Sequence, residues 1–212
     1  MQAAAAHTNV MVVGIGGQGV MTAAEVIARA ALASGFDASK TEVSGMSQRG
    51  GIVCSQVRIG RKIMASEIRP GEADLLIALE VAEGLRWSHW LAPGGIAYVN
   101  TFQAVPPIVA SGAATYPAAP LEDAAAAGAE VLAVDADAMA KALGDRRLSN
   151  TIMLGTAAAR LPFSPAALKR TLLERFTADH PMRTLNARAF DAGAAVELVA
   201  VATPSGDETT RI

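Results

Sequence analysis

The sequence predicts an α/β fold that is Rossmann-like, with a mostly parallel sheet, an antiparallel insertion and C-terminal helices. Short apolar runs typical of buried strands alternate with helical stretches, and a glycine-rich loop joins the first run to the first helix. Apolar residues make up 51% of the 212 residues but aromatic residues only 4%, so we expect close packing of small side chains. We predict one domain over residues 1–203 and a disordered tail over residues 204–212.

A buried strand over residues 9–15 (NVMVVGI) is the first predicted element, because this run is continuously apolar and rich in β-branched residues. Apolar residues at helical spacing then predict a helix from Gln18 to Ser34, which Gly35 ends. The strand, the glycine-rich loop and the helix therefore form the first unit of the sheet.

The antiparallel insertion is predicted from two runs that flank Gly60. Residues 36–43 form a second strand, and a polar loop with three glycines follows at residues 44–51. Residues 52–59 and 62–68 are then expected to pair as an antiparallel hairpin around the glycine.

The rest of the chain is expected to complete the sheet and to cover it. Further strands are predicted at residues 73–80, 96–100 and 129–136, with a helix after the first of them through Trp90. From about Asp137 the pattern is helical only, with helices at residues 137–143, 149–161, 165–178 and 184–202. We expect these tandem helices to close over one edge of the sheet.

Charge and hydropathy exclude several classes of protein. The net charge is −2 and the 18 lysines and arginines are scattered, which does not fit a nucleic-acid-binding protein. Uninterrupted apolar runs do not reach the 18 residues that a membrane span needs, so we expect no membrane partner. The N-terminal MQAAAAHTNV has no basic segment followed by a long apolar one, and we expect a cytoplasmic protein.

Cysteine and histidine usage argues against metal chemistry on this chain. Cys54 is the only cysteine, which excludes a disulfide framework and an iron–sulfur cluster held by four cysteines of this chain. We expect Cys54 to be a small buried hydrophobe. His7, His89 and His180 lack the spacing of metal ligands, so we expect no metal site.

The loop after the first strand matches the pattern G-x-G-x-x-G. Its candidate binding residues are Gly14, Gly16, Gly17, Gln18 and Gly19. Glycine allows a tight turn and a close backbone approach, and the start of a helix attracts anions, so the loop can hold a phosphate. The alternative is a loop that only turns a strand into a helix. A nicotinamide site would also need an acidic residue about 20 residues on, and the one candidate, Glu42, leads straight into a glycine-rich loop.

A second candidate site is the loop SGMSQRGG at residues 44–51. Gln48 and Arg49 place an amide donor and a fixed cation between glycines, and such a loop can hold a phosphate, a carboxylate or a partner protein. The alternative is a solvated loop whose glycines serve turns. Since the sequence contains no recognisable Ser–His–Asp set or pair of carboxylates at strand ends, we predict no catalytic residues and interpret the chain as a binding protein.

Several segments together resemble the gamma-type module of the 2-oxoacid:ferredoxin oxidoreductases, and within that family the beta subunits of the indolepyruvate branch. They are GIGGQGVMTAAEVIARAA, TEVSGMSQRGGIVCSQVRIG, SEIRPGEADLLIALE, NTIMLGTAAA and LNARAFDAGAA. The resemblance runs from about residue 9 to about residue 201. The presence of both glycine loops distinguishes it from an ordinary nicotinamide dehydrogenase.

The resemblance implies a subunit of an enzyme that decarboxylates an aryl 2-oxoacid such as indolepyruvate to an acyl-CoA, with electrons passed to ferredoxin or another acceptor. It implies that thiamine diphosphate and iron–sulfur clusters belong to a large alpha subunit, that coenzyme A is held at the two glycine loops or that these loops form the subunit contact, and that the isolated chain is inactive. Without its partner, the chain could form a homodimer. Two alternatives remain open from the residues alone: a stand-alone NAD(P)-dependent dehydrogenase and a non-catalytic scaffold protein.

Overall fold

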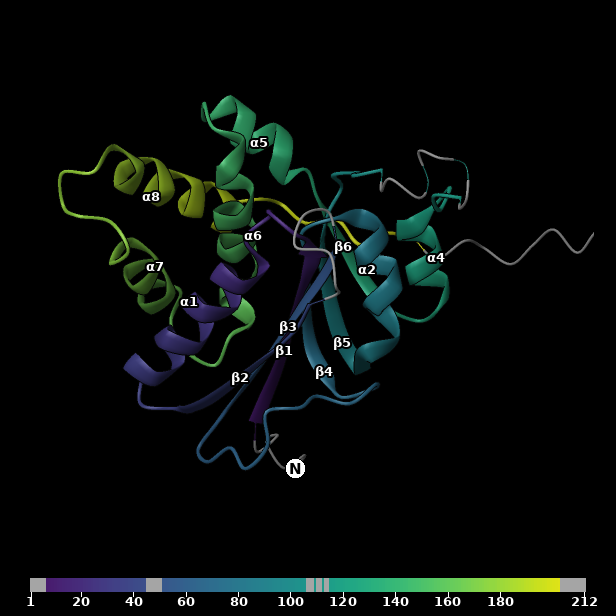
Figure 1. Ribbon diagram of the computed structural model, residues 1–212, viewed down its shortest axis with the longest axis horizontal. Helices are drawn as coiled ribbons and strands as arrows, with labels where there is room; N and C mark the ends of the chain where they lie inside the picture. The colour runs from purple at the N-terminus through teal and green to yellow at the C-terminus, as the bar shows by residue number, and fades with distance from the viewer. Residues whose placement is uncertain (1–6, 45–50, 106–108, 110–111, 113–114, 203–212) are drawn as a thin grey trace, which may run out of the picture.

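A mixed sheet of six strands forms the centre of the part of the chain that the computed structural model describes, residues 7–44, 51–105, 109, 112 and 115–202 (Figure 1). The strand order is β2-β3-β1-β4-β5-β6. The strands are β1 (His7–Ile15), β2 (Asp37–Ser44), β3 (Ile52–Gly60), β4 (Ala73–Ala78), β5 (Leu91–Asn100) and β6 (Glu130–Val134).

Strand direction confirms the predicted fold class. β1, β4, β5 and β6 run parallel, whereas β3 is antiparallel to both of its neighbours, β1 and β2. The carboxyl ends of the four parallel strands therefore lie along one edge of the sheet, together with the start of β3. In α/β sheets this edge is where ligands bind.

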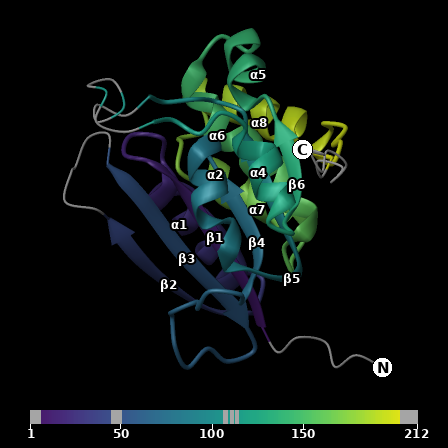
Figure 2. The same ribbon diagram turned by 90° about the vertical axis from the view of Figure 1, so that its right-hand side faces the viewer.

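Helices cover both faces of the sheet, as the continuously apolar strands require. They are α1 (Val20–Ala33), α2 (Val81–Trp87), α4 (Pro120–Ala126), α5 (Ala136–Ala142), α6 (Ser149–Ala157), α7 (Pro165–Leu173) and α8 (Pro181–Ala194). β1 shows the division: Val10 and Val12 face a core shared with α1 and α5–α8, while Met11 and Val13 face a second core shared with α2 and α4. Figure 2 shows this arrangement from the side of α2 and α4, with β2 and β6 at opposite edges of the sheet.

The hairpin predicted from residues 52–59 and 62–68 is wrong in its second strand. Residues 52–59 do form a strand, but β3 is already paired on both edges, by β1 and by β2, so no edge remains for residues 62–68. This segment instead runs across one face of the sheet and is held by side chains. Gln56 accepts a hydrogen bond from the Ile68 amide at 2.7 Å, and Arg58 donates to the Glu67 carbonyl at 3.0 Å.

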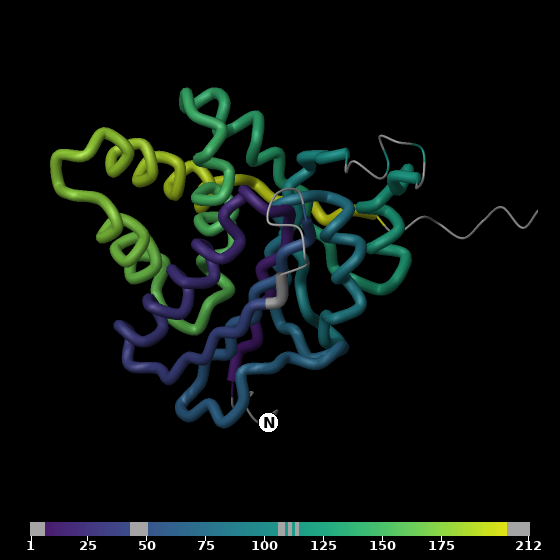
Figure 3. Tube along the Cα trace, viewed as in Figure 1, coloured from purple at the N-terminus to yellow at the C-terminus, as the bar shows by residue number. Residues whose placement is uncertain are grey.

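The last predicted helix, residues 184–202, is also too long. α8 begins earlier, at Pro181, and ends at Ala194, after which the chain crosses to the far edge of the sheet (Figure 3). There the Val201 amide donates to the Val131 carbonyl at 2.8 Å, and Ala200 bridges to Leu132 of β6. The run VELVAVA is rich in β-branched residues, and pairing with β6 satisfies an otherwise open strand edge.

The tandem C-terminal helices were expected to close over one edge of the sheet. They lie instead on the same face as α1. The helix α4 was not predicted. The predicted helix over residues 165–178 ends at Leu173. The predicted tail, residues 204–212, lies outside the described residues, and the single-domain boundary at residue 203 stays a prediction.

α6 and α8 cross with their backbones in direct contact, and two glycines make this contact possible. A Cβ atom on Gly155 would lie 2.2 Å from the Phe190 carbonyl oxygen, and one on Gly193 would lie 2.0 Å from the Ile152 carbonyl oxygen. Thr156 adds a hydrogen bond from its hydroxyl to the Gly193 carbonyl at 3.1 Å. The position of α8 relative to α6 therefore depends on the absence of these two side chains.

We predict that Gly193→Ala destabilises the protein, although alanine is the better helix former. Helix propensity alone would raise the free energy of unfolding by about 0.5–1 kcal/mol. The clash with the Ile152 carbonyl should instead lower it by about 1–3 kcal/mol or more, because backbone cannot move aside as a flexible side chain can. Urea denaturation measures the difference. Ala194→Ser, on the exposed end of the same helix, is the control, and a stabilised Gly193→Ala protein would refute the prediction.

Candidate functional site

The glycine-rich loop connects the end of β1 to the start of α1, as predicted. Gly17 and Gly19 have φ angles of +102° and +83°, which other residues rarely adopt, and Gly19 is the N-terminal cap of α1. A Cβ on Gly14 would lie 2.6 Å from Oε1 of Gln18. The loop therefore needs glycine at positions 14, 17 and 19 for conformation or for room, whether or not a ligand binds there.

The side chain of Gln18 folds back and holds the loop closed. Its Oε1 accepts from the Ile15 amide at 2.7 Å, and its Nε2 donates to the Leu79 carbonyl at 3.0 Å. Both ends of the amide are thus used inside the protein. The backbone amide of Gln18 also donates to the Ile15 carbonyl, at 3.1 Å, so Gln18 shapes the loop and leaves ligand contacts to its neighbours.

The Leu79 carbonyl is shared with a second amide side chain, which the sequence did not single out. Asn100, at the end of β5, donates from Nδ2 to Leu79 at 3.2 Å and accepts from the Ala136 amide at 3.1 Å. Leu79 follows β4 and Ala136 follows β6. Two side chains therefore join the carboxyl ends of all four parallel strands.

The two glycine loops meet at one hydrogen bond. The Gly16 amide donates to the Gly51 carbonyl at 2.9 Å. Gln48 and Arg49 lie outside the described residues, so their predicted role is not located here. Gly51, at the end of their loop, does lie beside the first loop, at the carboxyl edge of the sheet.

An open cavity of about 650 Å³ lies at the start of α1. It is lined by the glycine loop, by the chain before and at the start of α6, and by the facing ends of α7 and α8. Gly17, Gly19, Asn150, Arg146, Arg147 and Arg175 are among its lining residues. α1 has no acidic residue in its first turn and no side-chain cap. Its first amide groups are therefore left for an anion.

The cavity lining carries three arginines and one carboxylate, that of Asp137. Arg146 pairs with Asp137 at 2.9 Å and lies over the Phe102 ring at 5.8 Å from its centre. Arg147 pairs with Asp145 at 2.6 Å, whereas Arg175 forms no ion pair with any described residue. The charge balance at this cavity favours an anionic ligand.

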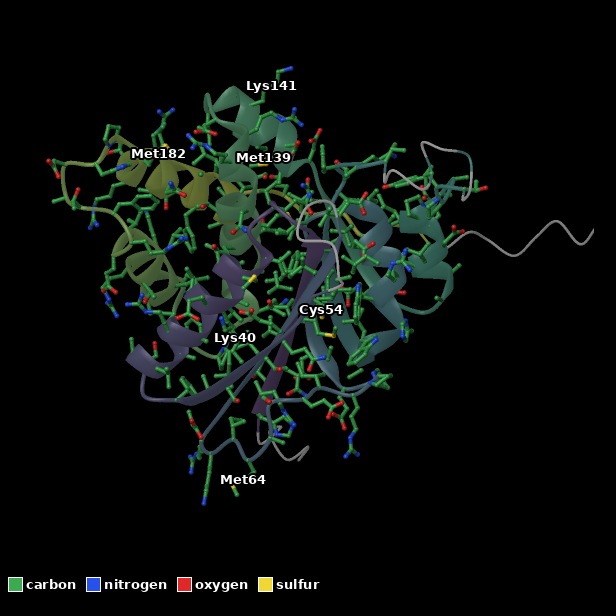
Figure 4. The ribbon with its side chains drawn as sticks, viewed as in Figure 1. Lys40, Cys54, Met64, Met139, Lys141 and Met182 are labelled. Carbon is green, nitrogen blue, oxygen red and sulfur yellow. The ribbon has the colours of Figure 1, made fainter. Side chains whose placement is uncertain are left out.

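Apolar and aromatic side chains line the other wall of the same cavity. The Phe176 ring stacks at a tilt on the His180 ring, with 5.5 Å between their centres, and Leu172 and Met182 lie beside them (Figure 4 labels Met182 on α8). Guanidinium groups next to aromatic and apolar walls can bind a ligand that has both phosphates and a flat ring.

A second cavity, of about 320 Å³, lies between α2 and the chain after β5 and is lined by two buried carboxylates. Glu80, 1% exposed, caps α2 by accepting from the Glu83 amide at 2.9 Å, and it also accepts from the Ala104 amide and the Tyr116 hydroxyl. Burial raises the pKa of the Glu83 carboxyl. Because Glu80 is satisfied by these three donors, we interpret it as the residue that fixes α2 and its neighbouring loop.

The structure gives Glu42 no place as a ribose-binding acid. β3 lies between β1 and β2, so Glu42 on β2 is separated from the glycine loop by a whole strand. Its carboxylate accepts from Lys40 at 2.7 Å, and Lys40 also pairs with Glu25 of α1 at 2.9 Å. In the usual dinucleotide-binding order the acid follows the strand adjacent to the glycine loop.

Cys54 is fully buried on β3 (Figure 4), as predicted, and burial raises the pKa of its thiol to about 12.

The three histidines lie in different parts of the fold. His180 accepts from the Met182 amide at 3.1 Å and caps α8. His7 lies 2.9 Å from Arg58, and His89 lies edge-on to Trp90. Within the described residues, no three His, Cys, Asp or Glu side chains are grouped so as to hold a metal ion.

Comparison with known proteins identifies the family. A family model described as pyruvate ferredoxin/flavodoxin oxidoreductase matches residues 9–196. The chain belongs to this family. It is 33% identical over 193 residues to indolepyruvate oxidoreductase subunit IorB of Thermococcus kodakarensis, which covers 87% of this chain and 93% of the relative. The IorB subunit of Pyrococcus horikoshii is 34% identical with the same coverage. The resemblance seen in the sequence is thereby confirmed.

Solved structures of the family share the fold of this member. The gamma subunit of a keto/oxoacid ferredoxin oxidoreductase from Geobacter sulfurreducens is 24% identical, with a TM-score of 0.64 over 88% of this chain and 95% of that one. Pyruvate oxidoreductase subunit PORC of Thermotoga maritima is 20% identical, with a TM-score of 0.68 over 92% and 98%. A 2-oxoglutarate:ferredoxin oxidoreductase from Magnetococcus marinus gives a TM-score of 0.71, and there this chain covers only 31% of the longer protein.

Sequence reasoning missed the cavity residues that come from the second half of this family member. Asn150 contacts the glycine loop, and the three arginines line the same cavity, from more than 100 residues away in the chain. Asn150 does begin the segment NTIMLGTAAA, which the resemblance singled out, but nothing in its local pattern pointed to the loop.

Among the described residues, no helix is long and apolar enough to cross a membrane.

We predict that Gln18→Ala lowers the free energy of unfolding by about 1–3 kcal/mol, because it removes two hydrogen bonds and leaves the Ile15 amide without its acceptor. Gln18→Glu should cost more, since a carboxylate oxygen would then face the Leu79 carbonyl. Urea denaturation measures both variants. Arg29→Gln, on the exposed side of α1, is the control, and Gln18 variants as stable as that control would show that the loop does not need this side chain.

We predict that Cys54 is almost inert in the folded protein. At pH 8 a thiol with a pKa of about 12 should react with iodoacetamide about a thousandfold more slowly than the unfolded chain, even before burial limits access. Mass spectrometry follows the alkylation. Ala159→Cys in a Cys54→Ala protein provides an exposed thiol for comparison. Equal rates at the two cysteines would contradict the prediction.

Proposed function

We propose that this chain is the IorB-type subunit of an indolepyruvate, or aryl 2-oxoacid, oxidoreductase. In this proposal the complete enzyme decarboxylates the 2-oxoacid oxidatively to an acyl-CoA and passes the electrons to ferredoxin or another acceptor. The proposal is supported by the family match and by relatives at 32–38% identity whose names carry that activity. The relatives are subunits, which implies a larger complex. We propose that the complex containing this chain acts in the cytoplasm.

The observation that carries our assignment within the complex is the arginine-lined cavity at the start of α1. Coenzyme A has phosphates, an adenine ring and a long flexible arm, and the cavity offers matching chemistry. The glycine loop supplies backbone amides, Arg175 supplies a cation without an ion-pair partner among the described residues, and the Phe176 ring supplies an apolar wall. We therefore propose that Gly14, Gly16, Gly17, Gln18 and Gly19 form the coenzyme A site. The Gly16 and Gln18 amides are used inside the protein, so the amides at the start of α1, from Gly19 on, would bind the phosphates.

Gln48 and Arg49 stay predicted members of the same site. Their loop ends at Gly51, which the Gly16 amide contacts. A guanidinium near that point would face either the coenzyme A phosphates or a carboxylate of the partner subunit. We keep both contacts as the proposed role of Arg49.

We assign thiamine diphosphate and the iron–sulfur clusters to the large alpha subunit. This chain has one cysteine, and it is buried on β3, so it has no set of thiolates to offer a cluster. In this proposal the chain positions the ligand by means of a rigid sheet edge, an anion-binding loop and fixed cations. It would hold coenzyme A so that the thiol reaches the acyl group formed on the partner.

We propose that the carboxyl edge of the sheet faces the partner. Three of the large apolar side chains that remain exposed among the described residues lie at or beyond this edge: Met21 in the first turn of α1, Ile52 at the start of β3 and Val105 beyond β5, exposed by 50%, 37% and 58%. Exposed apolar groups beside a binding loop are typical of a contact that is covered in the assembled protein.

Charge reversal at Arg175 tests the coenzyme A assignment. In the complex purified with its partner subunit, Arg175→Glu should raise the coenzyme A concentration for half-maximal rate by about 10- to 100-fold, because a charge-assisted hydrogen bond contributes about 1.5–3 kcal/mol. Arg188→Glu makes the same charge change at an exposed position of α8 that does not line the cavity, and it is the matched control. Arg49→Ala is measured alongside.

Two outcomes would count against the proposal. If both arginine reversals change the coenzyme A dependence equally, the effect is one of overall charge and the cavity is not the site. If the wild-type complex shows no coenzyme A dependence with any aryl 2-oxoacid, the proposed reaction itself is wrong. Loss of subunit assembly on Arg49→Ala, with an unchanged coenzyme A dependence, would assign that loop to the partner contact alone.

A further inference from the structure

Asn150 connects the C-terminal helices to the glycine loop. It is the second residue of α6, and its side-chain Nδ2 donates to two carbonyls of the loop, that of Gln18 at 3.0 Å and that of Gly19 at 2.8 Å. The two partners are 132 and 131 residues away in the chain. No other side chain of the described residues donates to these two carbonyls.

The chemistry of the amide fixes which way this side chain points. Both protons of Nδ2 are used, one on each carbonyl, and the opposite orientation would place Oδ1 against two carbonyl oxygens. The contact is also close on the loop side, because a Cβ on residue 19 would lie 2.7 Å from Nδ2. Glycine at position 19 thus serves the contact with Asn150 as well as the left-handed backbone.

Holding these carbonyls fixes the direction of two amide groups. In a trans peptide the C=O and the N–H that follows it point in opposite directions, and the described residues contain no cis peptide. The direction of the Gln18 carbonyl therefore determines the direction of the Gly19 N–H, and the Gly19 carbonyl does the same for the Val20 N–H. The Gly19 carbonyl also accepts from the Ala23 amide along α1, so the Val20 N–H points out of the start of the helix.

Hydrogen bonds between α6 and α8 fix the backbone next to Asn150. The hydroxyl of its neighbour Thr151 donates to Oδ1 of Asn186 at 2.6 Å, and Nδ2 of Asn186 donates to the Met182 carbonyl at 2.8 Å. Thr151 and Asn186 are 4% and 6% exposed. The start of α6 is therefore fixed to α8 by satisfied, buried polar groups, and this rigidity passes to Asn150.

We propose that Asn150 is a positioning residue, which aims the Gly19 and Val20 amide groups of the glycine loop at the anion bound in the cavity. Through it, the helices α6 and α8 set the affinity of a site whose anion-binding backbone amides belong to the first 20 residues of the chain. The identity of that anion as coenzyme A rests on the proposed function. The positioning of the amides does not, because it is a property of the chain alone.

Hydrogen–deuterium exchange on the full chain without ligand tests the positioning directly. Asn150→Leu keeps the shape of the side chain and removes both donors, and Asn150→Ala is the second variant in case leucine disturbs folding. Both should speed exchange of the hydrogen-bonded amides in residues 18–23, those of Gln18 and Ala23, by about five- to tenfold relative to wild type. The control is Asn9→Leu, at the opposite end of β1. It also removes two side-chain hydrogen bonds of an asparagine, the donation to the Glu72 carbonyl at 2.7 Å and the acceptance from Arg58 at 3.0 Å.

The second measurement is the coenzyme A dependence of the assembled enzyme. Asn150→Leu should raise the coenzyme A concentration for half-maximal rate by about tenfold and leave the maximal rate close to wild type, because saturating ligand restores the amide geometry. Asn9→Leu should change neither quantity. A purely structural role of Asn150 would instead lower stability without separating the two kinetic quantities.

Exchange in residues 18–23 that stays at the wild-type rate in both Asn150 variants overturns the inference. So does faster exchange there in Asn9→Leu to the same extent, because the effect would then be general destabilisation. If exchange responds to Asn150 but the wild-type enzyme does not depend on coenzyme A, the positioning stands and the proposed function fails. If coenzyme A dependence is present but insensitive to Asn150, the proposed function stands and the ligand role of Asn150 is refuted.

Discussion

The Leu79 carbonyl is the acceptor on which the arrangement of the site depends. Gln18 and Asn100 both donate to it, and through them the ends of β1, β4 and β5 and the start of α5 beyond β6 are held in one hydrogen-bonded group. Strand ends at the edge of a sheet would otherwise have open amides and carbonyls that compete for water. Because this edge is satisfied from within, its geometry does not need a ligand to form.

Because the edge is closed by hydrogen bonds within the protein, folding of the glycine loop and contact with a ligand would depend on different groups. The Gln18 side chain is used to fold the loop. In the proposed function, coenzyme A would therefore be held by backbone amides at the start of α1 and by side chains brought from elsewhere. Those side chains come from the chain around α6, α7 and α8, whose packing depends on backbone contact at Gly155 and Gly193. The packing of the α6–α8 pair and the shape of the cavity are therefore linked physically, although the residues concerned are far apart.

Local sequence pattern was sufficient for the parts of the fold that local physics determines. Continuous apolar runs located the strands, and Ser34 with Gly35 located the end of α1. Residues 62–68 have the same alternation as a strand, but β1 and β2 already occupy both edges of β3, and no local signal reports that. Asn150, Asn100 and Arg175 were missed for the same reason, since their roles arise only when distant segments meet.

The order of strands also explains why a glycine loop of this pattern does not imply a nicotinamide site here. In a dinucleotide-binding sheet the ribose acid follows a strand that lies directly beside the glycine loop. Here the antiparallel β3 takes that position, Glu42 is moved one strand outward and is paired with Lys40, and the Gly16 amide contacts Gly51 at the start of β3. The space beside the loop is thus taken by a second glycine-rich segment of the same chain. A ligand at this edge would be recognised through its phosphates from the α1 side, where the arginines lie, and not through a ribose hydroxyl from the β2 side.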